Sequence, residues 1–302
     1  MEQYSYSKLD TYSSCGFKYK LKYVDKIQFE FTNTIATEFG TCIHSIEEDI
    51  AKAIKAGQPI DYISLKNRLI LKRYELEHRY AEVFDELDKS SRTYLQKTYE
   101  YLESGIYRLE NFMKEHPTYE VVGTEVGFSV EFEDVRFKGF IDRVLRDTAT
   151  GEIIIHDIKS WAIPKEQKEL TTPLQFVIYC FAAQKLYGVD PCSVKCAYDL
   201  PCCDLIQDAG TKGFITRGTK KLHDLIEAIR EGKFKPAPSP WCHWCEYCPT
   251  NPCQPASAKG KVFCPYYSLW TRNNPTFAVA ETWQGLENHG IVLENYIKKH
   301  FR

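Results

Sequence analysis

The segment Gly151–Ser160, with the sequence GEIIIHDIKS, constrains the fold of this chain more than any other stretch. Its three consecutive isoleucines are typical of a short strand that is buried on both faces. Asp157 and Lys159 follow at the end of this strand, and side chains two residues apart on a strand point to the same side. We therefore expect a carboxylate and an ammonium to be held together there. Such a pair suits a divalent cation with a neighbouring water or phosphate, or it is an ordinary strand-end ion pair.

The acid-x-Lys pattern is not decisive alone, because it occurs three times in the chain. Glu166 with Lys168 and Glu231 with Lys233 have the same form. Only the Asp157 copy ends an apolar strand, so the surrounding residues must separate a functional site from an ion pair.

A change in hydrophobic period near residue 119 predicts two further strands before this one. Residues 119–132 alternate between apolar and polar, residues 135–147 follow, and a turn at 148–151 leads into the isoleucine strand. This order predicts an antiparallel meander in which Asp142 and Asp157 meet across neighbouring strands. Two carboxylates and Lys159 would then form a metal site. The alternative is that Asp142 pairs with Arg143 or Arg146.

The remaining segments before residue 235 are mainly helical in pattern. We expect a helix at residues 4–26, a helix from Gly40, a helical insertion at 62–116, a helix at 174–188, a strand at 194–200 and a helix at 222–232. In the helix from Gly40, His44 and Glu48 lie one turn apart, which is also the spacing of a surface pair. Gln175 and Tyr179 share one face of the helix at 174–188.

Five of the chain's 12 cysteines fall between Cys242 and Cys264. Cys-x-x-Cys repeated through a shared cysteine is a strong metal signal, since disulfides are unlikely in a reducing compartment. Zinc or an iron–sulfur cluster would fit.

A net charge of −2 over 302 residues argues against a generally basic nucleic-acid binder, although a local basic groove is compatible with it. Near the N-terminus Lys18, Lys20 and Lys22 alternate with tyrosines, which suits a phosphate backbone with stackable bases. A solvated helix face explains the same pattern equally well. No stretch is typical of a signal or a membrane span, so we expect a cytoplasmic protein.

Taken in order, these motifs resemble the RecB-like branch of the P-D-(D/E)-x-K nuclease superfamily. In layout the chain is similar to the iron–sulfur exonucleases related to the AddAB nuclease domains and the CRISPR adaptation nucleases, which include phage-encoded relatives. The matching motifs are Ser-x-Ser-Lys-Leu-x-x-Tyr-x-x-Cys15, Gly-x-x-x-His44, Gly-x-x-Asp142, Asp157-x-Lys159, Gln175-x-x-x-Tyr179 and the clustered cysteines.

The resemblance implies an α/β fold with a restriction-endonuclease-like core, in which a mixed central sheet is flanked by helices. It implies a nuclease domain at residues 1–235, with a helical insertion at about 60–116. Residues 236–302 would form a Cys-rich metal-binding segment packed back on the N-terminal helix.

The resemblance also implies roles for the matched residues. Mg²⁺ or Mn²⁺ would be held by Asp142, Asp157, His44 and the backbone carbonyl of Ile158, with Glu125 as an outer-shell acid. Lys159 would position or activate the attacking water, and DNA would be contacted by Gln175, Tyr179, Lys18, Lys20 and Lys22. A [4Fe–4S] cluster would be held by Cys15, Cys242, Cys245 and Cys253, with Cys248 or Cys264 as substitutes for the last ligand and with Zn²⁺ as the alternative metal.

The function implied is that of a Mg²⁺- or Mn²⁺-dependent deoxyribonuclease acting on single strands or duplex ends, an exonuclease in preference to an endonuclease. Its setting would be DNA recombination, repair, replication or phage DNA processing. One alternative is a non-catalytic DNA-binding or assembly subunit that keeps the nuclease fold and the cysteine site. Another is a zinc-dependent interaction module.

Overall fold

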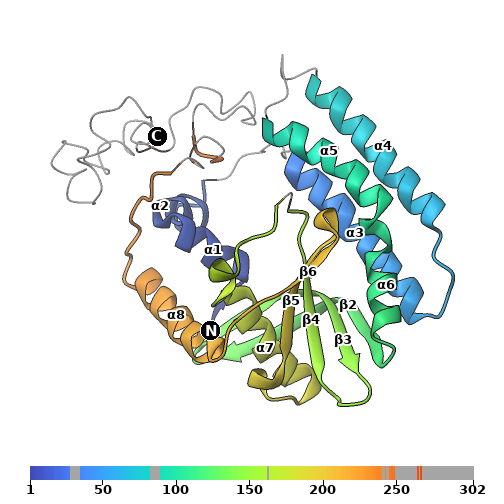
Figure 1. Cartoon of the computed structure of the whole chain (residues 1–302). Coiled ribbons are helices and arrows are strands. Elements are labelled where there is room, and N and C mark those ends of the chain that lie inside the picture. Colours follow the sequence, from blue (N-terminus) through green and yellow to red (C-terminus); the bar gives the residue numbers. More distant parts are fainter. Residues whose placement is uncertain are drawn as a thin grey trace. The chain divides into compact units, whose positions relative to one another are not determined.

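Figure 1 presents the chain as a computed structural model, which describes residues 1–27, 35–81, 89–161, 163–239, 242, 245–248, 264 and 266. The chain divides into two units. Unit 1 comprises Met1–Tyr6 and Thr34–Leu222, and unit 2 comprises Ser7–Asn33 and His223–Arg302. Each unit is described separately below.

Unit 1 is built on a six-stranded mixed sheet, in the order β1-β3-β4-β5-β6 with β2 paired to β3. Strands β2, β3 and β4 are antiparallel, and β4 and β5 run parallel. The meander and the strand at 194–200 are therefore confirmed, whereas β6 was not anticipated. The strands are β1 (Glu2–Tyr4), β2 (Tyr119–Phe132), β3 (Val135–Asp147), β4 (Ile153–Ile158), β5 (Lys195–Leu200) and β6 (Leu205–Asp208).

Strand β4 is buried along its whole length, as its three isoleucines predict. Ile154 packs in a core with the helices on one face of the sheet. Ile153 and Ile155 pack in a second core on the other face. Asp157, near the end of β4, is fully buried as well, so its carboxylate needs polar partners inside the protein.

Four helices pack together against one face of the sheet (Figure 1). The longest, α3, turns an apolar stripe inward at every third or fourth residue, including Ile43, Ile46 and Ile50. These helices confirm the predicted helical character of the 62–116 region where it is described. They are α3 (Ile35–Lys55), α4 (Tyr62–Ala81), α5 (Lys89–Glu103) and α6 (Arg108–Glu115).

The opposite face is covered by α7 (Leu174–Tyr187) and by the first turns of α8 (Phe214–Arg230). Gly188 ends α7 in the left-handed conformation, as expected of a helix terminator. Helix α8 starts eight residues earlier than the pattern at 222–232 indicated. Short 3-10 turns lie at Gly105–Tyr107, Gln167–Leu170, Pro191–Ser193 and Pro201–Cys203. With helices on both faces of a mixed sheet, unit 1 has the α/β architecture that the resemblance implied.

In unit 2 the expected helix at 4–26 is interrupted at Cys15. It consists of α1 (Tyr6–Ser14), α2 (Gly16–Tyr19) and a π-helical turn at Lys20–Val24, while Tyr4 belongs to strand β1. Gly16 lies against the backbone of Lys235, where a Cβ atom would come within 3.0 Å of its nitrogen and oxygen. The Phe17 amide donates to the Lys235 carbonyl at 3.1 Å. The break therefore lets a distant segment of the chain approach the helix.

In the part of the chain that the structure describes, no helix combines the length and the apolar character needed to cross a bilayer.

Candidate active site

Asp142 and Asp157 meet across neighbouring strands, as the meander predicted. The antiparallel β3–β4 register pairs Arg143 with His156. Asp142, which precedes Arg143, and Asp157, which follows His156, therefore lie side by side. The Ile158 amide donates to Asp142 Oδ2 at 2.7 Å. The alternative partners of Asp142 are occupied elsewhere, because Arg143 binds other carboxylates and Arg146 lies 3.7 Å from Glu120.

The buried carboxylate of Asp157 is held by three side chains. Lys159 Nζ lies 2.6 Å from Oδ2. On α7, Gln175 Nε2 donates to Oδ1 at 2.8 Å and to the Tyr179 hydroxyl at 2.7 Å, and that hydroxyl lies 3.5 Å from Oδ1. The two-residue spacing of Asp157 and Lys159 and the four-residue spacing of Gln175 and Tyr179 thus produce the contacts they predicted.

His44, Glu125 and Asp142 form a group with metal-binding geometry. One ligand atom from each lies within 4.8 Å of the other two. His44 Nδ1 is 3.8 Å from Asp142 Oδ2, whereas the neighbouring Glu48 pairs with Lys52 at 2.7 Å. Glu125 has a φ of +45°, in the left-handed region that residues other than glycine seldom adopt. This backbone conformation, which no sequence pattern signals, brings a third carboxylate to the site.

The electrostatics of the group favour a cation. Burial raises the pKa of Asp142 to about 6, and burial together with the nearby Asp142 charge raises the pKa of Asp157 to about 6. Burial also raises the pKa of Glu125, helped by Glu48. Burial and Lys159 lower the pKa of His44, so its imidazole is neutral at neutral pH and free to act as a ligand. Oxygen donors with one imidazole are a donor set that Mg²⁺ and Mn²⁺ accept, so these residues fit the metal that the resemblance implies.

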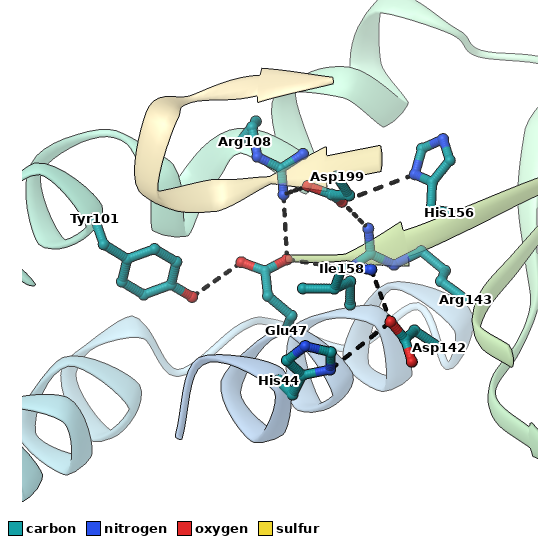
Figure 2. A network of polar contacts seen from close by, with 9 residues as sticks. All are labelled: His44, Glu47, Tyr101, Arg108, Asp142, Arg143, His156, Ile158 and Asp199. Atoms are coloured by element: carbon teal, nitrogen blue, oxygen red, sulfur yellow. Dashed lines mark hydrogen bonds and ion pairs between the residues drawn. The ribbon is translucent and has the colours of Figure 1, made fainter. Parts of the chain in front are cut away.

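Behind these residues lies a buried network of charged side chains (Figure 2). Arg143 lies 3.0 Å from Glu47 and 2.5 Å from Asp199, and all three side chains have no exposed surface. Arg108 bridges the same two carboxylates, and the Tyr101 hydroxyl donates to Glu47 at 2.9 Å. His156 lies 3.8 Å from Asp199. Two arginines thus balance two carboxylates inside the core.

The network and the candidate site share their backbone. Arg143 directly follows Asp142 on β3, and Glu47 lies one turn after His44 on α3. The Lys159 amide donates to the Asp199 carbonyl at 2.8 Å. Sequence reasoning missed this network, although a signal was present. Glu47 occupies the apolar stripe of α3 between Ile46 and Ile50, where a charged residue needs a buried partner.

The three lysines predicted to contact DNA lie in unit 2 and are paired with acids. Lys20 lies 2.6 Å from Asp25, Lys22 lies 3.0 Å from Glu246, and Lys18 lies 3.9 Å from Glu246. A contact with DNA would have to compete with these carboxylates, and the role of the three lysines stays a prediction.

Unit 2 also contains a cavity of about 490 Å³ bordered by cysteines. Its walls include the residues predicted from the sequence as ligands, apart from Cys253, which lies outside the described residues. Phe17, Leu21, Tyr247 and Tyr266 pack beside it. The cysteines of the cavity are Cys15, Cys242, Cys245, Cys248 and Cys264.

Backbone amides donate hydrogen bonds to two of the cysteine sulfurs. The Lys18 amide donates to Cys15 Sγ at 3.4 Å, and the Ser239 amide donates to Cys242 Sγ at 3.3 Å. Burial raises the pKa of Cys245 to about 11 and raises the pKa of Cys264 well above its usual value. Binding of a metal would therefore have to displace protons from these thiols.

The sulfur spacing differs from that around a bound zinc ion. Among the described residues no three cysteine sulfurs lie within 4.8 Å of one another. Tetrahedral zinc, with Zn–S bonds of about 2.3 Å, would place its sulfurs about 3.8 Å apart. No three of the described sulfurs therefore lie as close together as the ligands of a bound zinc ion would.

The family model described as the PD-(D/E)XK nuclease superfamily matches residues 3–253, most of the 302-residue chain. This chain therefore belongs to the PD-(D/E)XK nuclease superfamily, and the matched range includes Asp142, Asp157 and Lys159. Membership, together with the His44, Glu125 and Asp142 group, supports a metal-dependent nuclease that acts on DNA. No curated protein matches the chain in sequence.

Proposed function

We propose that this protein is a Mg²⁺- or Mn²⁺-dependent DNA exonuclease of the cytoplasm, acting in DNA recombination, repair, replication or phage DNA processing. The observation that carries this proposal is the convergence of His44, Glu125 and Asp142 beside the buried Asp157–Lys159 pair. Four ionisable side chains from four elements (α3, β2, β3 and β4), together with Lys159, are more than a strand-end ion pair requires.

In the proposed site the cation would be held by Asp142, Asp157, His44 and the carbonyl of Ile158, with Glu125 within reach of the same position. A divalent cation bound there would lower the pKa of a bound water and neutralise the charge that develops on phosphorus. The Lys159 ammonium would hold the attacking water and the phosphate oxygen in line. Gln175 and Tyr179 would keep the Asp157 carboxylate oriented through the hydrogen bonds at Oδ1.

An exonuclease is proposed over an endonuclease because the motif order resembles that of the RecB-like exonucleases. The second candidate is a non-catalytic DNA-binding or assembly subunit with the same fold. The intact set of acids, histidine and lysine favours the enzyme, since a subunit that does no chemistry has no need to keep all of them.

The test is digestion of DNA labelled at either end, as single strands, blunt duplexes and closed circles, with Mg²⁺, Mn²⁺ or EDTA. We expect metal-dependent release of short products from linear DNA, with closed circles left intact. Asp157→Asn and Lys159→Ala should remove the activity while DNA binding persists. Cutting of closed circles would show an endonuclease. If neither the wild-type protein nor the two variants cleave DNA, the result would support the non-catalytic subunit.

We also propose that the cysteine cavity holds a structural [4Fe–4S] cluster in preference to zinc. The volume of about 490 Å³ and the wide sulfur spacing support the larger group. Cys15, Cys242 and Cys245 would supply three ligands. We propose Cys264 as the fourth ligand, because its thiol borders the same cavity and the charges of those three cysteines act on its pKa. Cys248 and Cys253 are the alternatives.

A further inference from the structure

An aromatic side chain lies exposed on the strand that carries Asp142. Phe140 is 61% exposed near the middle of β3, although its neighbour Ile141 has no exposed surface. Alternation along the strand explains the difference, since successive side chains point to opposite faces. Phe137 and Ile141 enter the core, whereas Lys138 and Phe140 point outward.

This ring lies directly beside the candidate metal group. Phe140 is the Cα partner of Gly127 on β2. Asp142 comes two residues after Phe140, and Glu125 comes two residues before Gly127. Because two residues of a strand span about 7 Å, the Phe140–Gly127 pair lies about 7 Å along the hairpin from the acids that would hold the metal.

Gly127 leaves the ring uncovered on its cross-strand side. A Cβ atom at Gly127 would lie 3.4 Å from Cε1 of Phe140, so the ring leans over a position that has no side chain. Any larger residue at position 127 would fill this space. The hairpin therefore presents an aromatic surface instead of burying it between neighbours.

The same face is basic beyond the ring. Lys138 is the next outward residue, and its ammonium has no carboxylate within ion-pair distance among the described residues. Arg136 follows, 2.9 Å from Glu131. Lys18, Lys20 and Lys22 differ from Lys138 because each lies near an acid. An unpaired cation next to an exposed aromatic ring is complementary to a phosphate and its base.

We propose that this face of the β2–β3 hairpin binds an unpaired strand of nucleic acid, with one base stacked on Phe140 and a phosphate held by Lys138. The inference rests on the proposed nuclease function and adds the form of its substrate. A base inside a duplex has both faces covered by its neighbours, so stacking on Phe140 requires a strand that is single or locally melted beside the scissile phosphate.

The test measures binding by the full-length protein in EDTA, which prevents cleavage. The probes are a dye-labelled oligothymidylate of about ten nucleotides and an abasic strand of the same length and charge, followed by fluorescence anisotropy. Phe140→Ala should weaken oligothymidylate binding about 5- to 150-fold, the range that base stacking supplies. It should leave the abasic strand unaffected, and Phe140→Trp should keep both affinities. Leu71→Ala, at a residue 68% exposed on α4, is the matched control and should bind as the wild type does.

Lys138 is tested separately through salt. Lys138→Gln should lower the slope of log K against log salt by about 0.7, the contribution of one phosphate contact on a single strand. Lys114→Gln is the control, because Lys114 on α6 is 65% exposed and pairs with Glu110 of the same helix.

Three results would rule out the stacking surface. They are wild-type binding by Phe140→Ala, an equal loss on the abasic strand, or a wild-type self-association that Phe140→Ala abolishes, which would mean that a second copy covers the ring. These results are distinct from failure of the proposed function. Suppose that the wild-type protein cleaves no DNA with Mg²⁺ or Mn²⁺ while Phe140→Ala still weakens oligothymidylate binding. That pair of results would contradict the proposed nuclease function and support the binding surface.

Discussion

Glu47 and Arg143 form an ion pair that is fully inside the protein, with Arg143 Nη2 3.0 Å from Glu47 Oε2 and no exposed surface on either side chain. One partner is on α3, one turn after His44, and the other follows Asp142 on β3. The pair therefore joins the two elements that carry the histidine and one of the acids of the candidate site. Asp199 and Arg108 complete the charge balance.

Replacing Glu47 should destabilise the protein strongly. In Glu47→Ala, Arg143 and Arg108 lose a carboxylate that no water can replace, and breaking a buried pair from one side costs about 3–5 kcal/mol. Urea denaturation followed by circular dichroism measures the change. Glu227→Ala removes an exposed carboxylate that pairs with Arg230 at 2.9 Å, and it should cost about 1 kcal/mol or less. Similar losses for the two variants would show that the buried network contributes little.

Removing the Glu125 carboxylate should weaken metal binding. Glu125→Gln keeps the size of the side chain but loses the negative charge beside His44 and Asp142. We expect Mn²⁺ affinity, measured by isothermal titration calorimetry, to fall by about tenfold or more. Glu120→Gln, on the same strand and 51% exposed beside Arg146, is the control and should bind Mn²⁺ as the wild type does. An unchanged affinity in Glu125→Gln would leave Glu125 outside the metal shell.

Metal binding should depend on pH near 6. The folded-state pKa values of Asp142 and Asp157 are raised to about 6, so protons and the cation compete for the same carboxylates below that pH. Mn²⁺ affinity should fall as the pH is lowered from 7.5 to 5.5. Calorimetry at a series of pH values in several buffers would also show proton uptake or release.

The metal-free protein should show the opposite trend in stability. A carboxyl group with a raised folded-state pKa contributes stability that is fully present below its unfolded pKa and lost as the pH rises through about 6. We therefore expect the unfolding free energy in EDTA to decrease between about pH 4 and pH 6. Asp157→Asn removes one of the two groups, so its decrease should be smaller. A slope as steep as that of the wild type would place the titration elsewhere.

The fourth cluster ligand can be identified by iron content. Cys264→Ser should lower the iron bound per chain and the visible absorbance of protein purified without oxygen, because its thiol borders the cavity. Cys253→Ser should keep the iron content and the absorbance if Cys264 is the ligand. Loss of iron in Cys253→Ser but not in Cys264→Ser would identify Cys253 as the ligand. Cys192→Ser, at an exposed cysteine of unit 1, controls for the loss of a thiol. Stoichiometric zinc in place of iron in the wild-type protein would contradict the cluster.

The parts of the site predicted from the sequence are those set by local periodicity. The two-residue repeat of strands placed Asp157 beside Lys159, and the helical repeat placed Gln175 beside Tyr179. Strand order along a meander brought Asp142 to Asp157. Each of these relations spans one element or one hairpin, so it depends on backbone geometry that the chain specifies locally.

The parts that were not predicted depend on several elements at once. Glu47, Arg108, Arg143 and Asp199 come from two helices and two strands, and burial of each charge is tolerable only when the others are present. The left-handed conformation of Glu125 has no signal in the local sequence either. Gly16 did indicate a break in the first helix, but its cause was not predictable, because the space is needed by a segment more than 200 residues further along the chain.

Unit 2 is made from both sides of unit 1 in the sequence, and this order affects how the protein matures on the ribosome. Cys15 emerges early, but Cys242 is made 227 residues later, after the whole of residues 34–222. Domains generally fold as they leave the ribosome, N-terminal parts first. The sheet with its acids can therefore form during synthesis, whereas the cysteine cavity must wait for the last part of the chain. A chain still being synthesised would therefore contain the sheet with its acids before it contained the residues that complete the cysteine cavity.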